Sequence, residues 1–179
     1  WDDYDNKFKT RPGSVVVKIN QKTQVVNPHS KWQYTFSDLP KYDAKGNVIK
    51  YEPELEALNS AYTTTQTGND FTNTYRNTET TSVSGSVYWK DYDNKFKTRP
   101  DQVEINLLAN GELVTTIMTD AKQNWDYSFP QLPKYDEKGE LVTYQSQMVE
   151  KSPYAMKQSS NDFIHTYQRD EKKTLTMTI

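Results

Sequence analysis

The chain has 179 residues, of which 34% are hydrophobic, and a formal net charge of -2 with acidic and basic residues interspersed. This charge pattern offers no basic face for nucleic acid, no apolar run approaches the roughly 20 residues of a membrane-spanning helix, and the absence of cysteine excludes disulfides. The chain nevertheless contains 13 Tyr, 6 Phe and 4 Trp, and each buried ring covers roughly 150–250 Å². The sequence therefore predicts a folded protein with a small aromatic core and a polar surface.

Much of the sequence occurs twice. Residues 3–12 and 91–100 are identical. Further stretches match at nearly the same spacing: 30–47 with 123–140, and 67–75 with 159–167. Internal repeats of this kind bear directly on the fold, and each copy of about 90 residues is large enough to hold its own core.

The predicted elements, taken in chain order, are β-strands. In copy one, apolar residues alternate with other residues over 15–19 and again over 32–36. In copy two, the same alternation covers 103–107 and 125–129. Period-two alternation rich in β-branched and aromatic residues is typical of half-buried strands.

Turn residues separate these strands. Gly46 and Gly139 occupy matching positions where a tight turn needs positive φ, and Asn110-Gly111 is a strong hairpin signal. No stretch shows a helical apolar stripe. The sequence therefore predicts an all-β protein with two tandem β-sandwiches.

At this level of detail the chain resembles a known family. Copy one reads W-x-D-x-D-N, then RP, an alternating strand, W-x-Y-x-F-x-x-LP-x-YD-x-x-G, and finally F-T-N-T-Y, and copy two follows the same pattern nearly end to end. This combination resembles the Cna-B-type domain, the B-repeat of Gram-positive collagen adhesins. The resemblance implies an immunoglobulin-like β-sandwich in a stalk or pilus. It also implies, for many members, a Lys–Asn isopeptide bond promoted by a buried Glu or Asp.

Copy two lacks the three reactive groups that this resemblance implies. At the positions of the family's Lys, acid and Asn it has Val87, Met148 and His165. A buried carboxylate without a Lys partner would carry a large desolvation cost, so apolar replacements of suitable volume are favourable. We therefore expect no intramolecular isopeptide bond in copy two.

Copy one retains Asn73, but its Lys position lies upstream of Trp1. Strict counting places Leu55 at the acid position, whereas a shifted register offers Glu54 or Glu56. We interpret Asn73 as a hydrogen-bonded strand or turn residue, with a reactive Asn as the alternative.

A first strand is predicted before copy two and another after it, but none before copy one. Residues 79–87 precede the first Trp of copy two and are predicted to be its first strand, and residues 171–179 fall in the equivalent place after copy two. There Leu175, Met177 and Ile179 alternate as a strand should. Copy one is thus expected to lack a first strand, and the tail to supply a spare one. The predicted divisions are 1–78, 79–170 and 171–179.

Unpaired strand edges and exposed apolar side chains favour strand addition. We expect residues 172–179 to fill the vacant first-strand position of copy one in a neighbouring molecule, giving head-to-tail self-association. Two alternatives stay open: the tail closes a sheet within its own domain, or it begins a third repeat and its pairing has no role.

Four acidic residues are weak candidates for a metal site. Asp3, Asp5, Asp91 and Asp93 could ligate Ca²⁺ through oxygen, but Lys7 stands where an EF-hand needs a ligand. We interpret them as residues whose side chains hydrogen-bond to the backbone of turns. No metal and no cofactor is predicted, and no catalytic set is evident, so the chain is not expected to be an enzyme.

The leading functional prediction is a structural stalk or spacer module of a Gram-positive, cell-wall-anchored adhesin or pilin, which projects a ligand-binding domain from the cell. Its expected partners are neighbouring repeats of the same protein, and a host matrix ligand through other domains. No nucleic acid and no membrane insertion by this segment are expected. The alternative is a module that itself binds carbohydrate or a host extracellular-matrix protein, with Tyr and Trp as stacking platforms.

Overall fold

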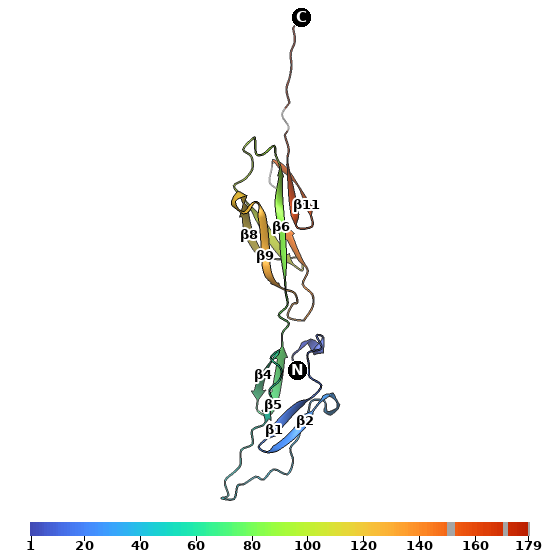
Figure 1. The fold of residues 1–179 in the computed structure, drawn as a ribbon, viewed down its shortest axis with the longest axis vertical. Helices are drawn as coiled ribbons and strands as arrows, with labels where there is room; N and C mark the ends of the chain where they lie inside the picture. The colour runs from blue at the N-terminus through green and yellow to red at the C-terminus, as the bar shows by residue number, and fades with distance from the viewer. Residues whose placement is uncertain (150–152, 170–171, 179) are drawn as a thin grey trace. The chain divides into compact units, whose positions relative to one another are not determined.

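The structure is a computed structural model that describes residues 1–149, 153–169 and 172–178. The chain divides into two compact units, unit 1 formed mainly by residues 1–77 and unit 2 by the chain from residue 78 onwards. Both are built from β-strands, and the helices among the described residues are short 3-10 turns (Figure 1). The predicted all-β fold class is confirmed.

Unit 2 is a two-sheet sandwich. One sheet has the order β10-β7-β8 and the other β11-β12-β6-β9. This arrangement matches the expected immunoglobulin-like architecture. The elements are β6 Thr80–Lys90, β7 Gln102–Ala109, β8 Glu112–Asp120, η3 Ala121–Gln123, β9 Asp126–Pro133, β10 Tyr144–Gln147, β11 Tyr154–Ser159 and β12 Asp162–Tyr167.

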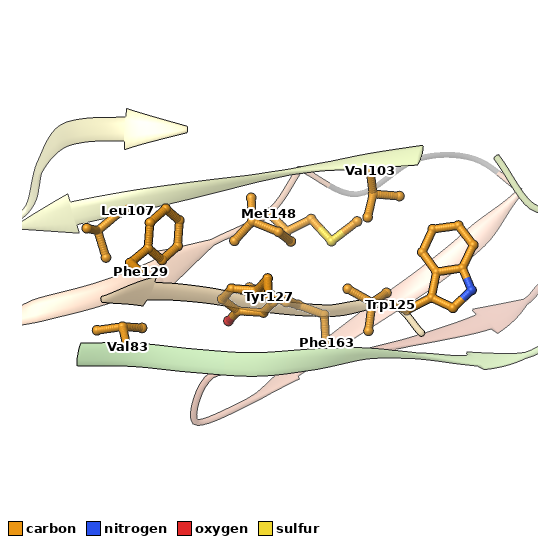
Figure 2. Close-up of a cluster of buried hydrophobic side chains, with 10 residues drawn as sticks. Val83, Val103, Leu107, Trp125, Tyr127, Phe129, Met148 and Phe163 are labelled. Atoms are coloured by element: carbon orange, nitrogen blue, oxygen red, sulfur yellow. The ribbon is translucent and has the colours of Figure 1, made fainter. Parts of the chain in front are cut away.

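The core of unit 2 joins side chains from both sheets (Figure 2). Ile105 and Leu107 of β7 and Phe163 of β12 are completely buried. Burial alternates along β7 and along the first half of β9, which confirms the two strands predicted from period-two alternation. The cluster consists of Val83, Val87, Val103, Ile105, Leu107, Trp125, Tyr127, Phe129, Met148 and Phe163.

Strand β6 lies in the middle of its sheet. It pairs in parallel with β12, with Val87 opposite Phe163, and antiparallel with β9, with Val83 opposite Phe129. Both edges of β6 are therefore hydrogen-bonded, and its apolar side chains enter the core. The first strand predicted for copy two forms, and it continues to Lys90.

Unit 1 has the same chain order with fewer strands. Its sheets are β2-β1-β3 and β4-β5. Its buried cluster consists of Val15, Val17 and Val26, against which only partly buried aromatic and leucine side chains pack. The elements are η1 Tyr4–Asn6, β1 Val15–Ile19, β2 Lys22–Val26, η2 Pro28–Ser30, β3 Glu54–Leu55, β4 Tyr62–Thr67 and β5 Asp70–Tyr75.

One strand predicted in unit 1 does not form. Residues 32–36 show the same alternation as 125–129, yet residues 33–37 carry no strand, whereas their counterparts belong to β9. Strand β9 is held by its ladder to β6, and among residues 1–77 no strand pairs with residues 33–37. A single bridge, Asp2 to Thr74, stands where the end of such a strand would pair with β5.

The predicted turns are confirmed. Asn110 and Gly111, with φ of 53° and 87°, connect β7 to β8, as two residues with positive φ do in a type I′ hairpin. Gly46 and Gly139 also have positive φ, at 79° and 72°.

The strand expected over residues 171–179 is not formed in its described part, 172–178. Leu175 and Met177 are 80% and 90% exposed, and Ile179 lies outside the described residues. Alternation alone does not make a strand, because an isolated extended segment has no ladder to satisfy its backbone. These residues therefore do not close a sheet within unit 2, and their addition to a second molecule stays a prediction.

Candidate functional site

An open cavity of about 260 Å³ lies in unit 1 where unit 2 holds a strand. Its lining comes from β1, β2, β3 and β5, from the segment that follows η2 and from Trp1. We call it the first-strand groove, and its lining residues are Trp1, Val15, Val17, Val26, Trp32, Tyr34, Leu55, Asp70, Phe71 and Asn73.

Several counterparts of these residues pack against β6 in unit 2. Matching residues include Val17 and Ile105, and Phe71 and Phe163. In unit 2 they belong to one buried cluster with Val83 and Val87 of β6 (Figure 2). Unit 1 has no such side chains among residues 1–77, and Phe71 is only half buried while Phe163 is completely buried. Several residues that line the groove thus correspond to residues that pack against β6 in unit 2.

The isopeptide-equivalent positions of unit 2 lie in or beside its core. Val87 and Met148 belong to the buried cluster. His165, which is 1% exposed, stacks on Trp89 with ring centroids 4.8 Å apart. These three side chains fill the region by packing, and none of them is an amine, carboxyl or amide group.

In unit 1 the backbone register indicates which residue occupies the acid position. Leu55 pairs with Val17 and packs against the buried cluster. Glu54 and Glu56 are exposed, and Glu56 lies 3.8 Å from the Lys18 ammonium group. The apolar side chain that strict counting selects is thus the one that lines the groove.

Asn73, the retained Asn, is 5% exposed, and its Oδ1 accepts a hydrogen bond of 2.7 Å from the Thr64 hydroxyl on the paired strand β4. This geometry agrees with the interpretation of Asn73 as a hydrogen-bonded strand residue.

Intact-mass spectrometry tests the isopeptide prediction. We expect no loss of ammonia from copy two, because Val87, Met148 and His165 supply neither an amine, a carboxyl nor an amide at the isopeptide-equivalent positions. Replacing Asn73 with alanine serves as the control and should change the mass only by the substitution. A peptide crosslinked through a Lys side chain, found after proteolysis, would contradict the prediction.

The repeated decapeptide forms a buried ionic clamp in each unit. In unit 2 the Arg99 guanidinium donates to both carboxylate oxygens of Asp91, at 2.9 and 2.6 Å, and the Tyr154 hydroxyl donates at 3.1 Å. The hydrogen bonds from Arg99 hold the pKa of Asp91 below its usual value, in opposition to burial, which raises it. Unit 1 repeats the arrangement with Asp3 and Arg11.

The clamp occupies two of the four aspartates that were weak candidates for metal ligands. Asp3 and Asp91 are almost completely buried and engaged by arginine, whereas Asp5 and Asp93 are exposed. Among the described residues no group of three or more acidic or histidine side chains is placed to hold a metal ion. Sequence reasoning missed the arginine partner, although both copies place an Arg eight residues after the buried Asp.

Comparisons with known proteins identify the family. The model of the Cna protein B-type domain matches residues 1–74 and 83–168. A collagen adhesin of Staphylococcus aureus is 40% identical over 155 residues, which is 80% of this chain and 13% of that protein. This chain therefore spans a small part of the relative's length.

Solved structures of the same kind are similar as well. The crystal structure of two B repeat units of the collagen-binding protein of Staphylococcus aureus is 35% identical, covers 93% of this chain and 47% of its own, and has a TM-score of 0.61. A single B repeat unit of that protein is 29% identical, with coverage of 94% and 95% and a TM-score of 0.47.

These matches also bear on activity and location. The relatives are surface adhesins of Gram-positive bacteria, and Cna B-type domains are repeats without enzymatic activity. Nowhere in the described ranges is there a helix long and apolar enough to cross a membrane. Because the family model covers both copies almost end to end, the chain belongs to the Cna protein B-type domain family and carries that domain twice in tandem.

Proposed function

We propose that the chain is a structural spacer in the stalk of a wall-anchored surface adhesin or pilin, where it separates a ligand-binding domain from the cell. The observation that carries the proposal is the tandem repetition of a domain in which each copy has its own apolar cluster. Repeats with separate cores can be added or removed to change length without altering a binding site. The similarity to repeat units of an adhesin supports the same role.

The alternative, direct binding of carbohydrate or matrix protein, receives less support from the aromatic side chains. All four tryptophans pack in edge-to-face pairs, Trp1 with Trp32 at 4.9 Å and Trp89 with Trp125 at 5.0 Å. Each of these rings thus packs against another tryptophan, which leaves less of its surface for stacking on a ligand. We propose that any collagen or glycan ligand is bound by other domains of the parent protein.

A display experiment separates the two functions. The chain is inserted between a surface anchor and a small domain of known ligand, and is compared with a direct fusion of the two. A spacer is expected to increase capture of large ligand-coated particles while leaving the affinity for soluble ligand unchanged. Saturable, micromolar binding of collagen or a glycan by the chain itself would overturn the spacer proposal in favour of the alternative.

We also propose that the first-strand groove is completed by strand addition, and that residues 172–178 of a second copy can supply the strand. The groove exposes an apolar lining, and the tail carries the unpaired, exposed Leu175 and Met177. A strand in the groove would pair with β5 as β6 pairs with β12. The contact is head-to-tail, so it generates chains of molecules rather than closed dimers.

Self-association is measured by light scattering over a range of concentrations. We expect the average mass of the full chain to rise with concentration, and the rise to disappear when residues 172–179 are deleted. A matched control replaces the exposed Thr174 and Thr176 with serine and should still associate, because these residues alternate with the apolar ones. A monomer at every concentration would contradict head-to-tail addition.

A further inference from the structure

Four tryptophan and tyrosine side chains of unit 2 form a continuous line of rings, which we call the aromatic relay. The Trp89 ring lies 5.0 Å from that of Trp125 and 5.0 Å from that of Tyr154, measured between centroids. Tyr154 in turn lies 5.7 Å from Tyr167, which is partly exposed at the end of β12. Centroid separations of about 4.5–7 Å are those of aromatic rings in contact, so an electron can pass from each ring to the next.

The Tyr154 hydroxyl lies beside a proton acceptor. It donates a hydrogen bond of 3.1 Å to a carboxylate oxygen of Asp91, within the clamp. A buried tyrosine loses an electron readily only if its hydroxyl proton leaves with it, because the tyrosine radical cation is a far stronger acid than a carboxylic acid. Asp91 can therefore accept this proton even though Arg99 holds the pKa of the carboxyl below its usual value.

Unit 1 has a relay of the same composition. Trp1 lies 4.9 Å from Trp32 and 5.4 Å from Tyr62. Tyr62 lies 5.7 Å from Tyr75, and its hydroxyl donates to a carboxylate oxygen of Asp3 at 3.0 Å. All four tryptophans of the chain therefore lie within two ring contacts of a tyrosine that has a carboxylate acceptor.

We propose that each aromatic relay conducts one-electron oxidation from tryptophan to a tyrosine near the surface. A radical oxidant, such as a peroxyl radical, removes one electron from Trp89 or Trp125 and leaves a tryptophan radical cation. Tyr154 supplies the missing electron, its proton moves to Asp91, and a neutral tyrosyl radical remains. An electron from Tyr167 then reduces this radical, the proton returns from Asp91 to the Tyr154 oxygen, and Tyr167 releases its own proton to water.

The direction of transfer follows from the chemistry of the two ring types. At neutral pH a tyrosine that can release its proton is oxidised more easily than tryptophan, so the radical moves from Trp89 to Tyr154. At Tyr167 small reductants in the solvent can reach the radical and restore the tyrosine. A tryptophan radical that stayed in the core would instead take up oxygen and lose the shape that packs there. The relay thus protects the core, a role that is additional to the proposed spacer function.

Pulse radiolysis of the full chain tests the proposal, with the azide radical as the oxidant because it attacks tryptophan in preference to tyrosine. We expect the absorption of the tryptophan radical to convert into that of the tyrosyl radical at a rate independent of protein concentration, since the transfer is intramolecular. Tyr154→Phe keeps the ring but removes the hydroxyl, and phenylalanine is much harder to oxidise. The amplitude of the conversion should therefore fall by about half in Tyr154→Phe and be lost when Tyr62→Phe is added.

Tyr144→Phe is the matched control. Tyr144 belongs to unit 2 and its hydroxyl donates to the carbonyl oxygen of Pro133 at 2.8 Å, but its ring is not part of the relay, so the conversion should be unchanged. The native chain supplies a second readout that a purely structural role of Tyr154 would not move: the conversion should be slower in heavy water, because a proton moves with the electron. An unchanged amplitude in the double variant, a rate that rises with protein concentration, or an equal rate in heavy water would each overturn the proposal.

Discussion

Replacing Phe163 with alanine is expected to lower the free energy of unfolding of unit 2 by about 3–5 kcal/mol. Phe163 is completely buried at the centre of a ten-residue cluster to which both sheets contribute. Removing the ring leaves a cavity that the flanking strands, paired on both sides of β6, cannot readily close. Urea denaturation followed by amide hydrogen exchange measures the loss for each unit separately.

Phe71→Ala is the matched control, because Phe71 is the counterpart of Phe163 in unit 1. Its ring is half buried beside the open groove, so the loss should be well below that of Phe163→Ala. Equal losses for the two variants would contradict the difference in burial between Phe71 and Phe163.

Replacing Asp91 with alanine is expected to destabilise unit 2 by about 3 kcal/mol, since removal of one partner leaves the other charge without compensation. The Asp91 carboxylate is 1% exposed in its side chain and accepts from Arg99, from the Tyr154 hydroxyl and from the backbone of Asn94. The identical decapeptide supplies the control, because Asp3→Ala should destabilise unit 1 and leave unit 2 unchanged. If Asp91→Ala left the stability of unit 2 unchanged, or lowered that of unit 1 instead, the clamp would not stabilise its own unit.

The same clamp predicts how stability depends on pH. Hydrogen bonding from Arg99 lowers the pKa of Asp91 below its usual 3.8, as Arg11 does for Asp3. A carboxyl whose pKa is depressed in the folded state contributes its full stabilisation above the unfolded pKa and loses it as pH falls through the folded value. The urea concentration at the unfolding midpoint, measured between pH 7 and pH 2, should therefore decrease once the pH drops below about 4.

Asp91→Asn tests this assignment. The amide keeps the shape of the side chain but does not titrate, so unit 2 should be less stable at pH 7 and its stability should vary less across the acid range. An unchanged acid transition in unit 2 would mean that other carboxyls control it.

The local apolar alternation correctly predicted those strands that pair on both sides or end at a tight turn. The alternation over 103–107 identifies β7, and Asn110-Gly111 places the hairpin to β8, because both signals depend on neighbouring residues only. The same reasoning was wrong for 32–36. Those residues have the composition of a strand, but no neighbouring strand forms hydrogen bonds with them. Whether such a partner strand is present does not follow from the segment's own sequence.

The site was predicted only in part for the same reason. Counting from Tyr51 selected Leu55, and the register with β1 places Leu55 at the groove, because spacing along a strand is preserved between the copies. The hydrogen bond from Arg99 to Asp91 joins two residues within an irregular segment. Such a segment has no apolar alternation from which the contact could be predicted. Nor does the sequence show why Gly85 is glycine, which depends on a carbonyl 76 residues away in the chain.

The parallel pairing of β6 with β12 has a mechanical consequence. These strands are the first and last of unit 2, and they run side by side in the same direction, with register from Val87 opposite Phe163 to Lys90 opposite Thr166. Tension applied to the two ends of the unit pulls β6 toward its start and β12 toward its finish, so the load falls on the whole ladder as shear. The hydrogen bonds must then rupture together rather than unzip one by one, which is the loading geometry that best resists traction along a tether.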